Sequence, residues 1–369
     1  MQMLSARAAD LRTIAAHALA LLRCGSCRFA AYYFLSFQIA IIDGGQASWR
    51  WTAFGAIFWF LHSLGIELLN RYSDRVEDKI NRPERTALCE TVGFETIKRL
   101  AIAIWIVIAL MYVGWLYLFP NPVLAMLLWS GLFFGVCYSF LFRFKARRYL
   151  ALVVLTFPFG GPFIIGWAAT HGNLSPTEGL VDLIGRLGPF LLVLGCFFIG
   201  HAGIKDITDI AGDERVGYRS LWVALVRSRA NLTIRILVSV WFVACLIFIA
   251  AGCLPSRFVV LAGLWPLSLM FSGIASRAEL RADREAVREL FYHYWFLFLC
   301  VALYLLVPGW PAFWSIMGTA AYWILTSQYL HWTNGITFDG VQRIAWLISS
   351  PARPDFDRLQ DVTSAESSK

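Results

Sequence analysis

Long apolar segments recur along the chain and are separated by shorter polar connections. A helix needs about 20 predominantly apolar residues to cross the hydrocarbon core of a bilayer, and roughly ten segments approach that length. They cover residues 30–47, 51–69, 100–120, 122–142, 149–169, 187–204, 232–253, 257–275, 291–308 and 312–330. Because only helices and closed barrels satisfy the backbone within lipid, this pattern predicts an all-α, polytopic membrane helix bundle.

The composition favours a membrane-embedded chain over a soluble one. Of the 369 residues, 59% are hydrophobic and only 15% are charged, whereas soluble globular proteins carry about 25% charged residues. Aromatic residues reach 16%, and aromatic side chains anchor helices at membrane interfaces. These values predict an integral, multi-pass membrane protein.

The basic residues are distributed unevenly between two sets of connections. All but three of the 32 Lys and Arg fall in the N-terminal segment, the C-terminal tail and alternate connections. Arg50, Arg186 and Arg257 lie in the other connections. Under the positive-inside rule, this asymmetry places both termini in the cytoplasm and favours an even number of spans. Topology therefore explains the net charge of +8, and we expect no nucleic-acid partner.

The segments divide the chain into one membrane domain with short polar ends. Residues 1–24 form an N-terminal cytoplasmic segment, in which charged residues interrupt the apolar stretches and favour an amphipathic surface helix over a signal peptide. Residues 25–308 form the main transmembrane domain, and residues 309–330 form an extra C-terminal span. Residues 331–369 form a cytoplasmic tail, which is predicted to be disordered from residue 351 onward.

The first acidic motif follows the second apolar segment. Asn70, Asp74 and Asp78 are spaced four residues apart, so a helix extending from this segment would carry all three side chains on one face. Magnesium takes oxygen ligands and is commonly held by one or two carboxylates together with substrate phosphates. The spacing therefore predicts a magnesium site.

The second acidic motif follows the sixth apolar segment. Asp209 and Asp213 are again four apart, and Asp206 lies one turn before Asp209. Gly212 and Gly217 permit the chain to leave the helix tightly. Either motif alone also fits a solvated helix end. The expected topology places both motifs on the cytoplasmic face, where gathered carboxylates are unfavourable unless a cation neutralises them.

Basic residues accompany both motifs. Arg82 and Arg85 flank Pro83, which ends the helix of the first motif. Lys205 directly precedes the second motif. Guanidinium and ammonium groups pair with phosphate oxygens, so these side chains are candidates to contact a phosphate-bearing substrate.

The two motifs together resemble those of the UbiA superfamily of intramembrane prenyltransferases. The first family motif is Asn-x-x-x-Asp-x-x-x-Asp followed by Asn-Arg-Pro, which matches Asn70 to Asp78 and then Asn81 to Pro83. The second is Lys-Asp-x-x-Asp-x-x-Gly-Asp followed by Gly, which matches Lys205 to Asp213 and then Gly217.

A third segment extends the resemblance. Tyr138, Ser139 and the stretch from Arg143 to Lys145 are similar to the segment after the family's fourth helix. The resemblance covers about residues 25–308. It implies that this part is a UbiA-like transmembrane prenyltransferase domain with a nine-helix core, to which the tenth span is added.

The resemblance implies Mg²⁺-dependent transfer of a prenyl group from an isoprenoid diphosphate to a hydrophobic or aromatic acceptor, a reaction of isoprenoid and terpene biosynthesis. The implied metal ligands are Asn70, Asp74, Asp78, Asp206, Asp209 and Asp213. The implied diphosphate-binding residues are Asn70, Arg82, Arg85, Lys145 and Lys205. The implied catalytic residues are Asp74, Asp78, Asp209, Asp213, Tyr138 and Lys205. Tyr138 and Tyr72 are also candidates to stabilise an allylic cation through their aromatic faces, and a belt of interfacial tyrosines is an equally good explanation for both.

Alternatives remain open at this point. A UbiA-type terpene cyclase would use the same motifs and cyclise the prenyl chain without an acceptor. A transporter would place charges deep within its spans, whereas these acidic residues cluster at helix ends. His201, one turn before Lys205, is interpreted as a packed histidine rather than an acid or base. The sequence does not determine the acceptor, the prenyl chain length or the oligomeric state.

Overall fold

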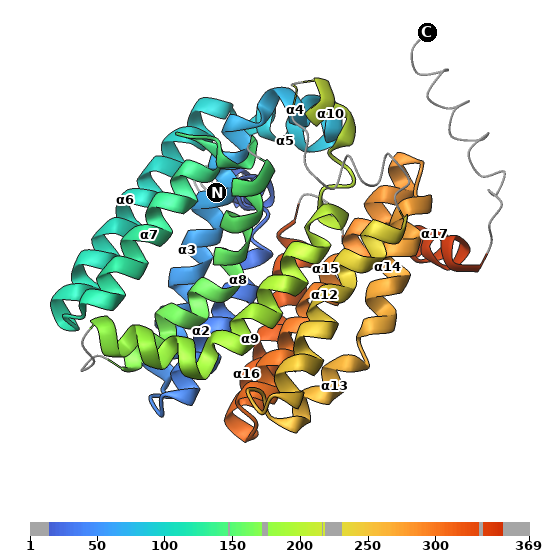
Figure 1. The fold of residues 1–369 in the computed structure, drawn as a ribbon. Coiled ribbons are helices and arrows are strands. Elements are labelled where there is room, and N and C mark those ends of the chain that lie inside the picture. The colour runs from blue at the N-terminus through green and yellow to red at the C-terminus, as the bar shows by residue number, and fades with distance from the viewer. Residues whose placement is uncertain are drawn as a thin grey trace, which may run out of the picture.

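The computed structural model describes residues 15–146, 148–171, 176–215, 217, 231–331 and 335–349. Helices make up all the regular secondary structure of these residues, which confirms the all-α prediction. The longer helices form a bundle (Figure 1). In chain order they are α2 (Phe29–Asp43), α3 (Trp49–Ser73), α6 (Phe94–Leu118), α7 (Pro122–Ser139), α8 (Arg148–Thr170), α9 (Pro176–Lys205), α12 (Asn231–Ala250), α14 (Trp265–Arg277), α15 (Arg281–Leu306) and α16 (Trp310–Ile324).

Shorter helices lie at the ends of the bundle and in its connections. They are α4 (Arg75–Asn81), α5 (Pro83–Val92), η1 (Phe144–Ala146), α10 (Ile210–Arg215), η2 (Ser256–Phe258), α13 (Val259–Ala262), η3 (Leu325–Tyr329) and α17 (Phe338–Ser349). In Figure 1, α4, α5 and α10 lie together at one end of the bundle. Both acidic motifs are therefore at the same end.

Each apolar segment expected from the sequence falls on helical residues of the structure. Seven helical stretches of the described chain are long and apolar enough to cross a membrane. They are Trp49–Ser73, Phe94–Leu118, Pro122–Ser139, Thr177–Lys205, Leu232–Ala250, Ser256–Arg277 and Arg281–Leu306. The protein is thus an integral, multi-pass membrane protein, while the number of ten spans stays a prediction.

Helix α2 lies at the centre of the fold. It packs against α3, α8, α15 and α16, and nearly all of its side chains are buried. Outer helices such as α6 and α12 instead expose large apolar residues, including Leu110 and Ile247. An exposed apolar surface on this scale suits contact with lipid tails rather than water. This arrangement puts the α2 side chains against the interior of the bundle, where the site described below is found.

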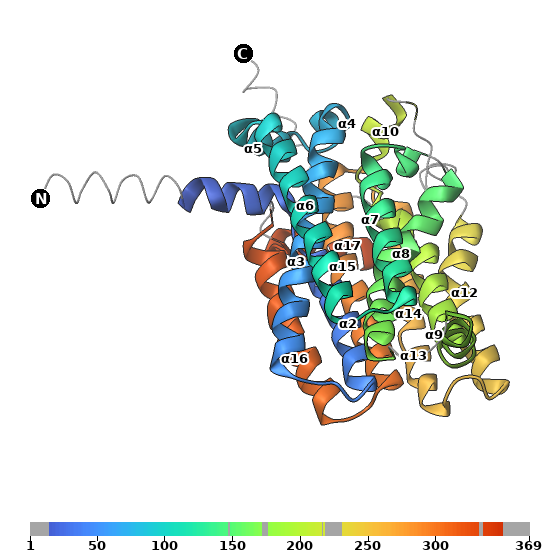
Figure 2. The ribbon, with the colours of Figure 1, turned by 90° about the vertical axis from the view of Figure 1, so that its left-hand side faces the viewer.

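Both ends of the chain carry helices that run across the bundle axis. Residues 15–25 are helical and extend sideways from the bundle in Figure 2. This fits the predicted N-terminal surface helix, of which residues 1–14 lie outside the described residues. Part of the predicted tail forms α17, which packs against α14 and α15. The stretch predicted to be disordered lies outside the described residues.

Candidate active site

The first motif lies where α3 bends into α4. Asp74 stands between the two helices with φ −100° and ψ 11°. Backbone hydrogen bonds continue through the bend, because the Asp74 N–H donates to the Asn70 carbonyl at 2.9 Å and the Asp78 N–H donates to the Asp74 carbonyl at 2.7 Å. The expectation of one uninterrupted helix is wrong at Asp74, which separates α3 from α4. The one-turn spacing of the three side chains is nevertheless kept.

Arg82 separates α4 from α5 as the position of Pro83 predicts. Arg82 adopts φ −146° and ψ 63°, outside the helical region that a following proline disfavours. Pro83 then takes the first position of α5, where a backbone N–H would have no helical partner. The break turns the Arg82 side chain toward the second motif.

The second motif spans the turn between α9 and α10. α9 ends at Lys205, and Asp206 and Asp209 flank the turn. The Asp213 N–H donates to the Asp209 carbonyl at 3.0 Å in the first turn of α10. Gly217 has φ +81°, a conformation that glycine adopts without strain, as predicted. Gly212 lies inside α10, so its predicted role in leaving the helix is wrong.

Gly212 instead brings the two motifs into contact. Asn81 Oδ1 accepts a hydrogen bond from the Gly212 N–H at 2.7 Å. A Cβ on residue 212 would lie 2.5 Å from Asn81 Nδ2, so a larger residue would force the Asn81 amide out of this contact. The contact docks α10 against α4, which lie side by side in Figure 1.

Arg82 forms the second link between the motifs. Its Nη2 donates to Asp209 Oδ1 at 2.5 Å and to Thr208 Oγ1 at 3.2 Å. Its Nη1 lies 3.9 Å from Asp78 Oδ1. A guanidinium presents several donors in a fixed plane, which allows one side chain to hold carboxylates from both motifs.

Three arginines surround the Asp78 carboxylate. Arg85 Nη2 lies 2.5 Å from Asp78 Oδ1, and Arg71 Nη1 lies 3.4 Å from Asp78 Oδ2; Arg82 is the third. Burial acts to raise the pKa of Asp78, but the three cations outweigh it and lower that pKa to about 2. Burial, reinforced by the neighbouring arginines, lowers the pKa of Arg85 to about 9. Arg85 is thus paired with Asp78, which is itself a predicted metal ligand. The predicted contact between Arg85 and diphosphate stays a prediction.

The two lysines predicted to contact diphosphate each pair with a motif carboxylate. Lys145, which lies on η1, contacts Asp74 Oδ1, and Lys205 contacts Asp206 Oδ1. These side chains are 16% to 23% exposed, in contrast to the nearly buried Asp78. Partly exposed ion pairs can exchange partners when a charged ligand arrives.

The carboxylates of the second motif repel one another, and their pKa values are shifted. Burial, followed by the charges of Asp209 and Asp206, raises the pKa of Asp213 to about 8. Burial also raises the pKa of Asp206. Burial acts in the same sense on Asp209, but Arg82 and Arg288 outweigh it and lower that pKa. Three carboxylates gathered in this way would be stabilised by a bound cation.

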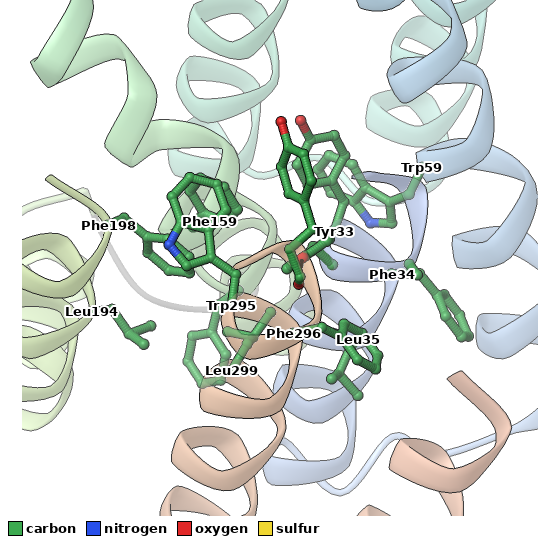
Figure 3. Packing of buried hydrophobic residues seen from close by; sticks show 14 of the residues in the cluster. Tyr33, Phe34, Leu35, Trp59, Phe159, Leu194, Phe198, Trp295, Phe296 and Leu299 are labelled. Carbon is green, nitrogen blue, oxygen red and sulfur yellow. Dashed lines mark hydrogen bonds between the residues drawn. The ribbon is translucent and has the colours of Figure 1, made fainter. Parts of the chain in front are cut away.

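A cavity extends from the motifs into the bundle. It has an empty volume of about 940 Å³, which includes the part that is open to the outside. Its aromatic lining is Phe29, Tyr33, Trp59, Tyr112, Phe134, Tyr138, Phe159 and Trp295. Figure 3 shows four of these side chains, Tyr33 on α2, Trp59 on α3, Phe159 on α8 and Trp295 on α15. Asn70, Glu67 and Lys205 add polar groups to the lining.

The oxygen-bearing side chains fit a magnesium ion that binds together with a phosphate ligand. Within the described residues, no three His, Cys, Asp or Glu side chains lie close enough to hold a metal by themselves. Magnesium usually needs only one or two carboxylates when phosphates complete its shell. Asn70 Oδ1, in the cavity lining, is buried without a hydrogen-bond partner, and a buried acceptor of this kind is unfavourable unless a ligand satisfies it.

Several residues of the site were missed by the sequence analysis. Arg288 on α15 donates from Nη1 to Thr208 Oγ1 at 3.0 Å, and it is 2% exposed. Arg143 donates to Glu77 Oε1 at 2.7 Å while holding φ +46°, a strained conformation for a non-glycine residue. The only signal for Arg288 is its place among charges that directly precede an apolar span.

Three further expectations can be compared with the structure. Tyr138 lines the cavity, and its role in stabilising a cation stays a prediction. The Tyr72 ring instead contacts Arg75 and Lys98, which agrees with an interfacial tyrosine. His201 is fully buried, and its Nδ1 lies 2.7 Å from the Phe197 carbonyl. This confirms its interpretation as a packed histidine.

Comparison with known proteins identifies the fold and the family. Similar solved structures include a digeranylgeranylglyceryl phosphate synthase, which is 15% identical with a TM-score of 0.52 over 79% of this chain and 98% of that chain. A UbiA homolog from Archaeoglobus fulgidus bound to GPP and Mg²⁺ is 13% identical with a TM-score of 0.54 over 78% of this chain and 99% of that chain. The same homolog bound to DMAPP and Mg²⁺ gives 12% identity and a TM-score of 0.53 over 78% of this chain and 99% of that chain.

At these identities the likeness to solved structures establishes a shared fold. No functionally curated protein matches the sequence. The UbiA prenyltransferase family matches residues 30–293, a stretch that includes both acidic motifs and most of the bundle. The chain therefore belongs to the UbiA prenyltransferase family.

Proposed function

We propose that this protein ionises a prenyl diphosphate at the end of the cavity nearest the motifs and transfers the prenyl group to a hydrophobic or aromatic acceptor within the membrane. One observation carries the proposal. Asn70 and Lys205 belong to the two docked motifs and also line the cavity, whose other walls are mostly aromatic or apolar. A substrate with a diphosphate head and an isoprenoid tail matches these two environments.

Diphosphate binding would exchange the partners of the existing ion pairs. Lys145 and Lys205 would leave Asp74 and Asp206 for phosphate oxygens, while Arg82 has further donors for the same group. The released carboxylates, with Asn70, Asp209 and Asp213, would hold magnesium. The exchange leaves each charge compensated, which matters because unpaired charges near the membrane interior are unfavourable.

Magnesium, when bound, would neutralise charge that develops on the leaving diphosphate. The complexes of the Archaeoglobus fulgidus homolog with GPP and Mg²⁺ and with DMAPP and Mg²⁺ support this assignment. The chain's own part is to position the head group with lysine and arginine side chains and to exclude water from the tail.

Aromatic side chains beside the head group would stabilise the allylic cation. Tyr138 lines the cavity together with Lys205 of the second motif. Each aromatic face contributes about 0.5–2 kcal/mol to binding a cation. Tyr138 is therefore the proposed cation-stabilising residue.

We place the motif end of the bundle and both termini on the cytoplasmic side. The support is the distribution of basic residues, of which all but three lie in the connections and termini assigned to that side. A water-soluble diphosphate would then enter from the cytoplasm, while the acceptor reaches the site through the bilayer.

A terpene cyclase is the second candidate. The largely aromatic and apolar lining of the cavity favours it, because a cyclase needs a shaped hydrocarbon surface and no acceptor. Both candidates share the ionisation step. They differ in whether diphosphate release requires a second substrate.

Membrane fractions incubated with prenyl diphosphates of increasing length, with and without aromatic acceptors, would test the proposal. Products are read by mass spectrometry, and diphosphate release is measured in parallel. We expect magnesium-dependent release that Asp74→Ala and Asp209→Ala each abolish. A matched control is Asp182→Ala, because Asp182 pairs with Arg186 on an exposed face of α9. Undiminished release in the Asp74 and Asp209 variants would refute the metal site, and acceptor-independent release of a cyclic hydrocarbon would favour the cyclase.

A further inference from the structure

A histidine and a tyrosine form a polar pair inside the aromatic cavity. His62 Nε2 and Tyr112 Oη are 2.6 Å apart. His62 is 5% exposed and Tyr112 is fully buried, and both line the cavity. The pair joins α3 to α6 within membrane-spanning stretches. An ionisable residue in such a position is a functional-site hypothesis by default, because lipid and apolar side chains offer it no solvation.

The pair lies deeper than the diphosphate site. His62, Ile66 and Asn70 all line the cavity and are spaced four residues apart along α3. Two helical turns separate His62 from Asn70, which corresponds to about 12 Å along the helix axis. The carbon that bears the diphosphate must stay near Asn70, so His62 and Tyr112 would face the isoprenoid chain beyond its first unit.

The surroundings of the pair suit a carbocation better than a polar acceptor. The His62 ring contacts the rings of Phe58, Trp59 and Trp105 at centroid distances of 4.8 to 5.5 Å. An acceptor that is to be prenylated has to reach the ionised carbon near Asn70. The His62–Tyr112 pair lies two helical turns deeper, so it would not hold an acceptor at that carbon. Of these rings Trp59 also lines the cavity, so its ring and the single imidazole together describe a site that can stabilise positive charge and remove a proton.

A purely structural role explains the pair less well. α3 and α6 already pack along their length, with apolar residues such as Ile104 and Ile108 buried between them and the core. Interhelical hydrogen bonds in membranes add little to such packing. A phenylalanine at either position would hold the helices together without placing a basic nitrogen in a hydrocarbon site.

We propose that the Tyr112–His62 pair accepts a proton from a carbocation held in the cavity, so that the prenyl chain can leave as an unsaturated hydrocarbon. This rests on the ionisation step of the proposed function. The C–H bond beside the cationic carbon breaks, and its electron pair becomes the new C=C bond. The proton goes to Tyr112 Oη while the Tyr112 proton moves to His62 Nε2. The pair loses this proton to water once the hydrocarbon has left, so the balance is prenyl diphosphate to hydrocarbon, diphosphate and one proton.

The test uses the purified full-length protein with Mg²⁺ and with geranyl, farnesyl or geranylgeranyl diphosphate, in the absence of an acceptor. Diphosphate is quantified enzymatically, and organic products are identified by gas chromatography and mass spectrometry. The readout is the amount of hydrocarbon formed per diphosphate released. We expect hydrocarbon from the unmodified protein, and a fall in this ratio of at least about tenfold in Tyr112→Phe and His62→Gln. Prenyl alcohol, formed when water captures the cation, should take its place.

Tyr32→Phe is the matched control. Tyr32 is also fully buried, and its hydroxyl donates to the Tyr292 carbonyl at 2.5 Å rather than to a cavity group. We expect Tyr32→Phe to keep the product ratio. His62→Gln retains a polar group of similar reach, so this substitution should leave the protein folded, and thermal unfolding of each variant verifies this.

The outcomes separate this proposal from the proposed function. Absence of magnesium-dependent diphosphate release from the unmodified protein, with or without acceptors, would overturn the proposed function itself. Diphosphate release accompanied by alcohol or transfer product alone would overturn only the proton-accepting role. An equal loss of hydrocarbon in Tyr32→Phe and Tyr112→Phe would also overturn it, because the effect would then reflect packing.

Discussion

Asn81 and Gly212 hold the two acidic motifs against each other across 131 positions of sequence, through a hydrogen bond of 2.7 Å from the Gly212 N–H to Asn81 Oδ1. A side chain at residue 212 would disturb this hydrogen bond, since a Cβ there would approach Asn81 Nδ2 to 2.5 Å and the Asn81 amide would have to move. Asn81 lies one turn after Asp78, and Gly212 directly precedes Asp213. The position of this contact therefore sets how the carboxylates of one motif face those of the other.

Gly212→Ala should disable the site while leaving the bundle folded. The added methyl group would push α10 away from α4, and a displacement of about 1 Å at a catalytic site can reduce turnover by about 100-fold. Magnesium-dependent diphosphate release by the purified variant gives the measurement. Gly114→Ala is the control, because a Cβ at residue 114 meets open space. Equal activity in the two variants would show that the close contact does not position the motifs.

Arg288 should act as a positioning residue for the second motif. Its Nη1 donates to Thr208 Oγ1 at 3.0 Å, and the Thr208 hydroxyl donates to Asp209 Oδ1 at 3.0 Å. Removal of groups that orient metal ligands typically reduces metal affinity or activity by about 10- to 100-fold. We expect Arg288→Gln to raise the magnesium concentration needed for half-maximal diphosphate release, with a smaller effect on the rate at saturating magnesium.

Arg284→Gln provides the comparison for Arg288, because Arg284 lies one turn earlier on α15 and donates to the Ala278 carbonyl. Arg288→Lys should restore part of the magnesium affinity by keeping the charge. A purely structural role for Arg288 would lower the unfolding temperature of Arg288→Gln without shifting its magnesium dependence.

Magnesium should bind this protein strongly only together with diphosphate. Asp74 and Asp206 are paired with lysines, and Asp78 is paired with arginines. Magnesium alone would have to displace these basic side chains from the carboxylates, which would leave their positive charges uncompensated. Saturating ligand at about 100 times its Kd stabilises a protein by about 2.7 kcal/mol. Thermal unfolding should therefore shift upward with magnesium plus inorganic diphosphate and hardly at all with either alone. An equal shift with magnesium alone would indicate a preformed metal site and contradict this reading of the ion pairs.

The sequence predicted the membrane bundle and both motifs, because each leaves a local signature. Apolar length identifies the helices, and four-residue spacing identifies Asn70, Asp74 and Asp78. The break at Asp74 was missed, because the four-residue spacing of the motif and the helical backbone hydrogen bonds continue through it. Contacts between distant segments, such as Asn81 with Gly212, leave no periodic pattern. His62 was not singled out, because one histidine in an apolar segment does not reveal whether it faces a cavity.

The buried pair of Arg28 and Glu289 offers a test of stability apart from activity. Arg28 Nη2 lies 2.8 Å from Glu289 Oε2, and both side chains are at most 7% exposed. The Arg28 guanidinium also lies 4.5 Å from the centroid of the Tyr292 ring. Removing one partner of a buried ion pair destabilises a protein by about 3–5 kcal/mol, whereas replacing both with apolar groups is often close to neutral.

Glu289→Met should therefore destabilise the native protein far more than it destabilises a protein that already carries Arg28→Met. Thermal unfolding in detergent micelles measures both effects. Glu289 also accepts from Arg288 Nη2 at 3.1 Å, so some cost of Glu289→Met should persist after Arg28 is removed. The exposed pair Arg186 and Asp182 serves as the control, since its 3.8 Å contact is open to solvent and such pairs contribute about 1 kcal/mol or less. Additive effects of Arg28→Met and Glu289→Met would mean that the two charges do not compensate each other. If the effects of the two substitutions are instead strongly coupled, the charges of Arg28 and Glu289 anchor the N-terminal end of α2 to α15. This anchor lies beside Arg288, which donates to Thr208.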